Sequence, residues 1–470
     1  MLSGERISAL SQRYALSMAA NTIAMLPDRA LSALARKKIE QGVKYPEGRE
    51  FVNQVLLNLK QGYRNTAGEC RRKFVQNFIG NYMLFSSRKR LDFTNTYGWE
   101  PPVLYVVSPT MKCNLTCPGC YSAHYSKQDV LTTDVLDRIF TEGKELGLYY
   151  VVISGGEPYF RNDLLDLFAK HDDMYFMTYT NGTIIRRKKL VPRLAKLGNV
   201  MPCLSVEGFE KETDERRGKG VFRTVVDVME EMKDAGMLFG FSVTCTKENN
   251  DVITSDEFVD FYQSKGAFLG WYFQYMPVGR EPDLSLIPTP KQRMERRKRI
   301  IELRRTRKIL LADFWNDGPL VGGCLSGGTQ YFHIAADGQV DPCVFAQFSV
   351  DNILDKSMVE VLHSDYFKEI RRRQKEMTNK LRPCMIIDRP QVLRDNVRAG
   401  GAHASQGGGE ATVTTLAGEL NAYAREYAAL ADEAWVSEYG MKKEKGTEGH
   451  LDLKVYGCGS TLRAARGGGS

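Results

Sequence analysis

The pattern that most restricts the fold is an alternation of short β-rich runs and helical stretches between residues 103 and 306. The runs are rich in Val, Ile, Phe and Tyr, and apolar residues recur at helical spacing between them. Such an alternation predicts parallel strands joined by right-handed helical crossovers. The predicted strands are Val103–Ser108, Tyr149–Ser154, Met174–Thr180, Met201–Val206, Leu238–Thr246 and Leu269–Met276. We therefore predict an α/β fold whose sheet is either open or curled into part of a barrel, with the chemistry at the carboxyl ends of the strands.

The first 100 residues are predicted to be helical, and they carry the net positive charge of the chain. They contain 16 Lys and Arg against 8 Asp and Glu, whereas the remaining 370 residues contain 49 of each kind. A basic, partly apolar helical region fits the anionic surface of a membrane. It fits equally well a set of helices that pack on the main domain with a solvated basic face. Both interpretations stay open at this point.

No apolar stretch approaches the ~20 residues that a membrane-spanning helix needs. The run Tyr14–Pro27 has the length of a signal-peptide core, but Asn21 interrupts it and no clear small-residue cleavage site follows. We expect a cytoplasmic protein, either free or peripheral at the membrane surface.

After residue 310 the pattern changes. Asp337–Gly338 lies between two β-rich runs and predicts a hairpin. Residues 398–411 are rich in Gly and Ala and are predicted to be a linker, followed by a helix over 413–440 and a disordered tail that contains Cys458. The predicted regions are therefore 1–100, helical and basic; 101–310, the strand–helix region; 311–397, a small C-terminal domain; and 398–470, linker, helix and tail.

Three cysteines crowd the loop predicted to follow the first strand, namely Cys113, Cys117 and Cys120. Cysteines so close together suit metal ligation in a reducing compartment better than disulfide bonding. Three thiolates can hold three irons of a cubane cluster and leave the fourth iron open to a small chelating ligand. Structural zinc is the alternative, but it takes four protein ligands. His124, four residues after Cys120 in the same loop, does not complete such a set.

The spacing Cys113-x3-Cys117-x2-Cys120 is followed by Ser154-Gly-Gly-Glu-Pro158 at the end of the next predicted strand. Together the two motifs resemble those of the radical S-adenosylmethionine (AdoMet) superfamily, and the resemblance covers about residues 103–390. It implies a (β/α)6 partial TIM barrel that binds AdoMet and a [4Fe–4S] cluster. Gly155 and Gly156 suit such a site, because a side chain there would block close approach of the backbone.

The resemblance also implies which residues bind AdoMet. Glu157 and the strand edge at Gly155 and Gly156 would accept hydrogen bonds from its cationic amine. Arg217 would bind its carboxylate through the guanidinium fork, with Arg216 as the alternative and a surface ion pair as the non-functional interpretation of either. The contacts implied for adenosine and ribose are Thr180, Asn181, Ser205 and Glu207.

One departure from the family pattern concerns adenine. Many relatives carry an aromatic residue directly before the third cysteine, packed on the adenine ring. This chain has Gly119 at that position and Tyr121 directly after the third cysteine, so Tyr121 is the candidate for this contact. Gln274 and Tyr275 end the sixth predicted strand and are expected to face the substrate.

A second group of cysteines follows the strand–helix region. Cys324, Cys343 and Cys384, with the spacing Gly338-x4-Cys343, resemble the auxiliary-cluster extensions called SPASM and twitch domains. A full SPASM domain carries more cysteines, so the resemblance implies one auxiliary [4Fe–4S] cluster here. Its fourth iron would be open to substrate or closed by Asp388 or His333. Buried structural cysteines are the alternative, and Cys203 and Cys245 are predicted to be core residues.

The function implied by the resemblance is reductive cleavage of AdoMet to a 5′-deoxyadenosyl radical, which abstracts hydrogen from an unactivated C–H bond. An external one-electron donor of the flavodoxin or ferredoxin type is the implied partner, and a peptide or a lipid is the expected substrate. RNA modification is an alternative, because the Lys- and Arg-dense stretch 291–308 would contact phosphates. A non-catalytic iron–sulfur electron carrier is another, although a carrier would not need Gly155, Gly156, Glu157 or Arg217.

Overall fold

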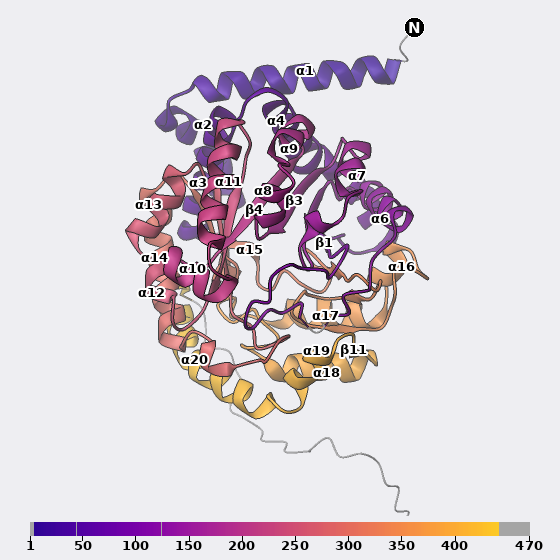
Figure 1. The fold of residues 1–470 in the computed structure, drawn as a ribbon, viewed down its shortest axis with the longest axis vertical. Helices are drawn as coiled ribbons and strands as arrows, with labels where there is room; N and C mark the ends of the chain where they lie inside the picture. The colour runs from indigo at the N-terminus through magenta and orange to yellow at the C-terminus, as the bar shows by residue number, and fades with distance from the viewer. Residues whose placement is uncertain (1–3, 44, 124, 441–470) are drawn as a thin grey trace, which may run out of the picture.

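A computed structural model describes residues 4–43, 45–123 and 125–440, with the backbone alone for residues 4–11 and 407. Seven parallel strands form the centre of the molecule (Figure 1). They are β1 (Tyr105–Val107), β2 (Tyr150–Ile153), β3 (Tyr175–Thr180), β4 (Val200–Val206), β5 (Gly240–Cys245), β6 (Leu269–Gln274) and β7 (Leu310–Asp313). The six predicted strands and the α/β fold class are confirmed, and β7 extends the sheet beyond β6 in the order β7-β6-β5-β4-β3-β2-β1-β8-β9.

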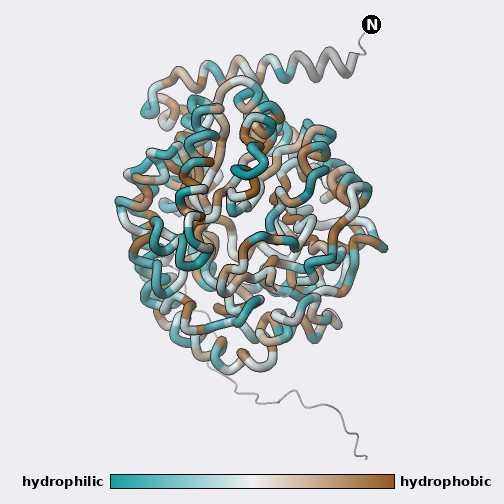
Figure 2. The backbone as a smooth tube through the Cα atoms, viewed as in Figure 1, coloured by the Kyte–Doolittle hydropathy of each residue, from teal (hydrophilic) through white to brown (hydrophobic). Residues whose placement is uncertain are grey.

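Helices follow the strands and pack on the sheet, as expected for parallel strands joined by helical crossovers. They are α6 (Thr133–Glu145), α7 (Leu164–Lys170), α8 (Thr183–Arg187), α9 (Val191–Leu197), α10 (Glu210–Arg217), α11 (Val221–Asp234), α12 (Asn250–Ile253), α13 (Asp256–Ser264) and α14 (Pro290–Thr306), with short 3-10 turns at Pro158–Phe160 and Leu284–Leu286. Several begin at a hydroxyl cap, since the side chains of Thr132, Ser255 and Thr289 each accept a hydrogen bond from the first turn. Figure 2 shows hydrophobic and hydrophilic positions interleaved along the outer helices, as expected for helices with one buried face.

The N-terminal region is helical, as its periodicity indicates. It comprises α1 (Gly4–Met25), α2 (Asp28–Gly42), α3 (Pro46–Asn65), α4 (Gly68–Lys73), the π-helix η1 (Phe74–Phe85) and α5 (Ser86–Tyr97). In Figure 1, α1 lies across one end of the molecule, at the top of the view. None of the described helices is both long enough and apolar enough to cross a bilayer.

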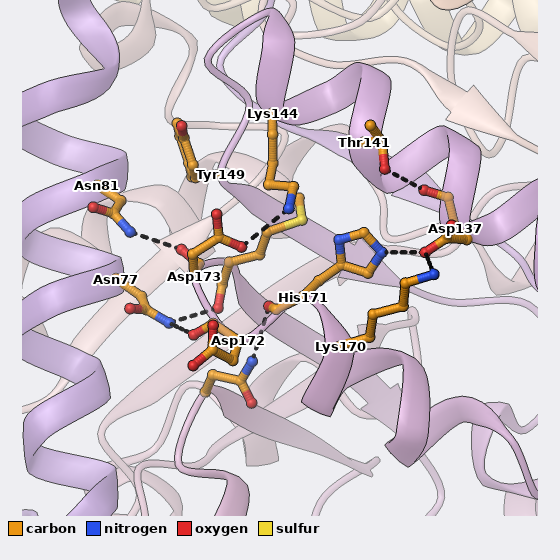
Figure 3. Close-up of polar contacts among 12 residues, drawn as sticks. Asn77, Asn81, Asp137, Thr141, Lys144, Tyr149, Lys170, His171, Asp172 and Asp173 are labelled. Carbon is orange, nitrogen blue, oxygen red and sulfur yellow. Dashed lines mark hydrogen bonds and ion pairs between the residues drawn. The ribbon is translucent and has the colours of Figure 1, made fainter. Parts of the chain in front are cut away.

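Polar contacts at the turn between α7 and β3 bind this region to the barrel (Figure 3). Asn77 of η1 donates hydrogen bonds to the carbonyl oxygens of Asp172 (2.7 Å) and Met174 (2.9 Å). Asn81 donates to the carbonyl oxygen of Asp173 (2.8 Å), and Lys144 of α6 pairs with the Asp173 side chain (3.3 Å). Backbone carbonyls beyond the end of α7 thus find donors on η1.

The C-terminal part continues the same sheet. The predicted hairpin is present as β8 (His333–Ile334) and β9 (Val340–Asp341), and β8 pairs in parallel with β1. The remaining elements are α15 (Gly318–Val321), β10 (Phe348–Ser349), α16 (Met358–Leu362), α17 (Asp365–Glu376), α18 (Pro390–Gly400), β11 (His403–Ala404), α19 (Gly407–Val413) and α20 (Ala417–Tyr439).

The segment 398–411, expected to be a linker, has regular structure instead. It contains the end of α18, strand β11 paired with β10, and most of α19. Gly400 and Gly408 permit close packing: a Cβ atom on Gly400 would lie 2.5 Å from Cδ2 of Tyr366, and one on Gly408 would lie 2.7 Å from the backbone nitrogen of Gly279. The expected tail, with Cys458, lies outside the described residues.

Candidate active site

A cavity of about 530 Å³ extends from the carboxyl ends of the strands into the interior of the barrel. Residues at alternate positions of the strands form its deeper wall, because successive side chains of a strand point to opposite faces. This wall is largely apolar and aromatic, and it includes Val106, Val152, Met177, Tyr179, Trp271 and Phe273. The loops after the strands form its rim. The chemistry therefore gathers where the strand order predicts it.

The cysteine loop after β1 forms part of this rim. Cys113, Cys117 and Cys120 all line the cavity as free thiols. The loop after β2 holds it in place, since the backbone nitrogen of Glu157 donates to the carbonyl oxygen of Lys112 (2.8 Å). His124, considered as a zinc ligand, lies outside the described residues.

Gly155 and Gly156 make that contact between the two loops possible. A Cβ atom on Gly155 would collide with the carbonyl oxygen of Thr110, and one on Gly156 would lie 2.6 Å from the carbonyl oxygen of Met111. Both glycines also line the cavity. The absence of side chains is thus required by the cysteine loop itself, whatever the cavity binds.

Glu157 lies behind the cavity wall rather than in it. Its carboxylate accepts hydrogen bonds from the Thr180 hydroxyl (2.9 Å), the Asn181 backbone nitrogen (2.9 Å) and the Tyr159 backbone nitrogen (3.2 Å). Burial nevertheless raises the pKa of Glu157 to about 7, because these hydrogen bonds compensate only in part for the loss of water. Glu157 therefore braces the ends of β2 and β3, while Thr180 and Asn181 line the cavity.

Glu207, after β4, has a similar supporting position. Its Oε1 atom accepts from Arg216 (Nη1, 2.6 Å) and from Arg217 (Nη2, 2.6 Å), and Glu207 is almost fully buried. Both guanidinium groups line the cavity, as does Ser205 on β4. Two positive charges thus face one carboxylate, which favours an added anionic group. Burial raises the pKa of the Cys117 thiol, and the charges of Arg217 and Arg216 act in the opposite direction.

The aromatic side chain nearest to Gly119 comes from a different strand end. Gly119 has a positive φ of 62°, and a Cβ atom on it would lie 2.5 Å from Cε2 of Tyr275. The ring of Tyr275 thus occupies the space beside the third cysteine. Tyr121 lines the cavity too, with its hydroxyl 2.7 Å from Oγ of Ser154 and its ring against Phe345. The position of Tyr275 directly after β6 was the sequence feature that could have indicated its place in the cavity.

The three C-terminal cysteines lie together next to the cavity but outside its lining. Burial raises the pKa of Cys324 and Cys343 to about 11 and that of Cys384 to about 12, and each thiol has another as an electrostatic neighbour. The Tyr331 hydroxyl donates to Sγ of Cys343 (2.8 Å), and Tyr331 lines the cavity. The cavity and the second cysteine group therefore share a wall.

The two residues considered as fourth ligands of that group lie in different places. Asp388 lies beside Cys384, and its Oδ2 atom accepts a hydrogen bond from the backbone nitrogen of Cys384 (2.9 Å). Arg293 pairs with both carboxylate oxygens of Asp388. His333 lies on β8 instead, 2.8 Å from the Ser108 hydroxyl and 3.3 Å from Asp341. Both Asp388 oxygens are thus occupied, and His333 belongs to a different buried network.

The donor sets fit iron–sulfur clusters better than single ions. No group of three or more His, Cys, Asp or Glu side chains in the described ranges gathers closely enough to hold one metal ion. A cubane makes a different demand, because each iron takes its own thiolate. Cys70, Cys203 and Cys245 are buried in the hydrophobic core, which confirms the prediction for the last two.

The basic stretch 291–308, considered for phosphate contacts in the RNA alternative, is partly buried. Four arginines of α14 are buried and form ion pairs within the protein: Arg293 with Asp388, Arg296 with Asp313, Arg297 with Glu47 and Glu438, and Arg304 with Asp317. These side chains are therefore not available for phosphate contacts.

Comparison with known proteins agrees with the site. Residues 107–258 match the Radical SAM superfamily, and residues 324–385 match the SPASM iron–sulfur cluster-binding domain. Mycofactocin maturase MftC of Mycolicibacterium smegmatis is 30% identical over 300 residues, which cover 59% of this chain and 74% of that protein. An AdoMet-dependent heme synthase of Oleidesulfovibrio alaskensis is 24% identical (56% and 75% covered), and a PqqA peptide cyclase of Rhizobium meliloti is 24% identical (60% and 80% covered).

Among solved structures, SuiB of Streptococcus suis bound to S-adenosylmethionine shares the fold, with a TM-score of 0.52 and 20% identity over 62% of this chain and 72% of that one. Sequence and fold agree with the two cysteine groups and the cavity between them. The chain therefore belongs to the radical SAM superfamily, as an enzyme whose cofactors are AdoMet, a [4Fe–4S] cluster and the auxiliary iron–sulfur cluster of a SPASM domain.

Proposed function

We propose that the enzyme abstracts a hydrogen atom from an unactivated C–H bond of a peptide held in the barrel cavity. When bound, AdoMet and the reduced cluster would supply the radical chemistry, in which one electron cleaves AdoMet to methionine and a 5′-deoxyadenosyl radical. The observation that carries the proposal is the cavity, which joins the first cysteine group to the apolar interior of the barrel.

In this proposal Cys113, Cys117 and Cys120 hold the AdoMet-binding cluster. The paired guanidinium groups of Arg216 and Arg217 bind the carboxylate of AdoMet, because Glu207 neutralises only one of their two charges. Adenosine contacts come from the cavity-lining residues Thr180, Asn181 and Ser205, with Gly155 and Gly156 at the backbone edge. Glu157 and Glu207 act as positioning residues for these groups.

Tyr275 supplies the aromatic contact for adenine that Gly119 lacks. Its ring lies beside Gly119, and its hydroxyl accepts a hydrogen bond from the backbone nitrogen of Asp283 (3.1 Å), which fixes the ring. Tyr121 is tied to the SPASM segment instead, since its carbonyl oxygen accepts from the Gln347 side chain (3.1 Å). Tyr121 thus closes the cavity on the side of the auxiliary cluster.

The rest of the cavity suits an apolar part of the substrate. Its aromatic walls exclude water, which protects a reactive radical from side reactions. The relation to a PqqA peptide cyclase supports a peptide as substrate. We further propose that Cys324, Cys343 and Cys384 hold the auxiliary cluster behind Tyr331, in a domain of residues 311–397. That cluster would bind the substrate or accept an electron from it, and an external flavodoxin- or ferredoxin-type donor would reduce the first cluster.

The first test concerns the cofactor sites. Replacing Cys113, Cys117 and Cys120 with Ala should remove about four irons per chain and all release of 5′-deoxyadenosine. Replacing Cys324, Cys343 and Cys384 should remove a comparable amount of iron but leave AdoMet binding intact. Iron analysis under argon distinguishes these outcomes, and loss of all iron in either variant would contradict two separate sites.

The second test concerns the substrate. The reconstituted enzyme is incubated with AdoMet, dithionite and either the peptide or the lipid fraction of cells grown in deuterated medium. Deuterium should appear in 5′-deoxyadenosine with the peptide fraction. Transfer from the lipid fraction alone would establish a lipid substrate and overturn the peptide proposal, and no transfer from either would contradict hydrogen abstraction from both classes.

A further inference from the structure

Exposed apolar side chains are concentrated in the N-terminal helices. Among the described residues, fifteen large hydrophobic side chains are exposed, and eleven of them precede residue 100. These eleven are Tyr14, Met18, Ile23, Met25, Leu34, Val52, Met83, Leu84, Phe85, Leu91 and Tyr97. Scattered exposed apolar residues are ordinary, but such a concentration in one region marks an interaction surface.

Helix α1 has an apolar face that points away from the protein. Tyr14, Met18 and Met25 fall on one side of the helix, because residues four and eleven apart return to nearly the same angle. They are 70%, 50% and 81% exposed. The opposite side holds the helix to the body, since Ala24 is buried and Leu16 lies against Gly80 of η1. The exposed face is thus not needed for packing of α1.

A second exposed apolar group lies at the corner between η1 and α5. Met83, Leu84 and Phe85 are 44%, 51% and 45% exposed. This corner adjoins α1, because a Cβ atom on Gly80 would lie 2.8 Å from Cδ2 of Leu16 and 3.4 Å from Cε2 of Phe85. We name the face of α1 (Tyr14, Met18, Met25) and this corner (Met83, Leu84, Phe85) together the N-terminal apolar surface.

Basic residues accompany this surface. The first 100 residues carry twice as many Lys and Arg as Asp and Glu, whereas the rest of the chain is balanced. Arg88 follows the corner by three positions, and Lys37 and Lys38 lie on α2, the next helix in sequence after α1; all three are exposed. Within the described chain, no acidic side chain pairs with any of them. Exposed apolar side chains and unpaired cations in the same N-terminal region match the interface of an anionic bilayer, which offers both acyl chains and negative headgroups.

We propose that the N-terminal apolar surface docks the enzyme peripherally on an anionic phospholipid bilayer. Nucleic acid would use the cations but would gain nothing from exposed Met, Leu and Phe side chains. The proposal does not rest on a peptide substrate, because the surface belongs to the N-terminal helices and none of its residues lines the cavity.

The test is flotation of the full-length, anaerobically reconstituted enzyme with vesicles. Binding is expected with phosphatidylcholine vesicles that contain phosphatidylglycerol, and only weakly with phosphatidylcholine alone. Met18→Glu, Phe85→Glu and the pair Lys37→Glu with Lys38→Glu should each weaken binding, the last by at least about tenfold. Leu354→Glu, at an exposed apolar position in the C-terminal part, is the matched control and should bind as the wild type does.

Circular dichroism and AdoMet cleavage in solution should be unchanged in all four variants, which separates docking from folding and catalysis. Equal binding to both kinds of vesicle, or equal weakening by Leu354→Glu, would overturn the proposal. Self-association that Met18→Glu abolishes, with no vesicle binding, would assign the surface to a second copy of the chain and would also overturn it. Vesicle binding without hydrogen abstraction would leave the docking proposal standing and remove only the proposed function.

Discussion

The pair between Arg293 of α14 and Asp388 of the Cys384 loop gives the most exacting test of the structure. Both side chains are completely buried, and Arg293 contacts both carboxylate oxygens. The guanidinium also donates to Oδ1 of Asn316 (3.1 Å) and lies 3.8 Å from the centre of the Tyr427 ring. Replacing Arg293 with Met removes the cation and leaves a buried carboxylate without a counter-charge.

Removing one partner of a buried ion pair lowers the free energy of unfolding by about 3–5 kcal/mol, because the remaining charge keeps its desolvation penalty. We expect Arg293→Met to lower the free energy of the first unfolding transition in urea by that amount. It should also lower the iron content by about one cluster, since Asp388 fixes the backbone of Cys384. Adding Asp388→Asn removes the unpaired charge, so the double variant should be more stable than Arg293→Met alone by about 2 kcal/mol or more.

Arg305→Met is the matched control on the same helix. Arg305 pairs with Glu50 at the surface, where such a pair is worth about 1 kcal/mol or less. A loss of stability in Arg293→Met no larger than that in Arg305→Met would contradict a buried and strongly coupled pair. Destabilisation of the double variant by the sum of the two single effects would contradict it as well, because the two charges would then not be coupled.

Three further predictions concern the cavity and the residue that supports its wall. Gly156→Ala should displace the cysteine loop, because the added Cβ atom would collide with the Met111 carbonyl oxygen. Titration with AdoMet should then show no binding, whereas Gly418→Ala, with open space around it, should bind AdoMet as the wild type does. Tyr275→Ala should weaken AdoMet binding by up to about tenfold while Tyr275→Phe retains it, since the ring rather than the hydroxyl makes the proposed contact; equal loss in both would exclude stacking. The pKa of Glu157 is raised from 4.5 to about 7, so between these pH values the folded AdoMet-free protein holds a proton that the unfolded chain has lost. The free energy of unfolding should therefore fall by about 3 kcal/mol as the pH rises through this range. Urea unfolding at each pH should show this slope in the wild type and not in Glu157→Gln.

The parallel strands were predictable because buried strands appear as continuous apolar runs, which the sequence shows from β1 to β6. Strand β7 could not be predicted, because it has only four residues and ends in Asp313. The charge of Asp313 is acceptable in the interior only because it pairs with Arg296. The cysteine motifs could also be predicted, since a cluster needs its ligands at short spacing. The residues around them could not, because Tyr275 lies more than 150 residues after Gly119 in the sequence and next to it in the fold.

The Arg-dense helix shows the same limit for charge. Its density of Lys and Arg made phosphate contact an alternative, yet four of its arginines are buried. Their acidic partners come from residues 47, 313, 317, 388 and 438, so these charges are paired only in the folded chain. The Gly-rich segment 398–411 was misjudged for a related reason. A glycine that permits close approach and a glycine that permits flexibility look identical until the neighbouring atoms are known.

The buried charges of α14 also link the cavity wall to the loop of Cys384. Gln274 in the cavity wall accepts a hydrogen bond from Arg296 (2.9 Å), which pairs with Asp313 (3.1 Å). From there Asn316 bridges Asp313 (2.6 Å) and Arg293 (3.1 Å), and Arg293 holds Asp388 against the backbone of Cys384. Because each of these polar groups is buried, breaking one link leaves another unsatisfied at a cost of about 1–3 kcal/mol. A continuous chain of buried polar contacts therefore connects the cavity wall to the backbone of Cys384.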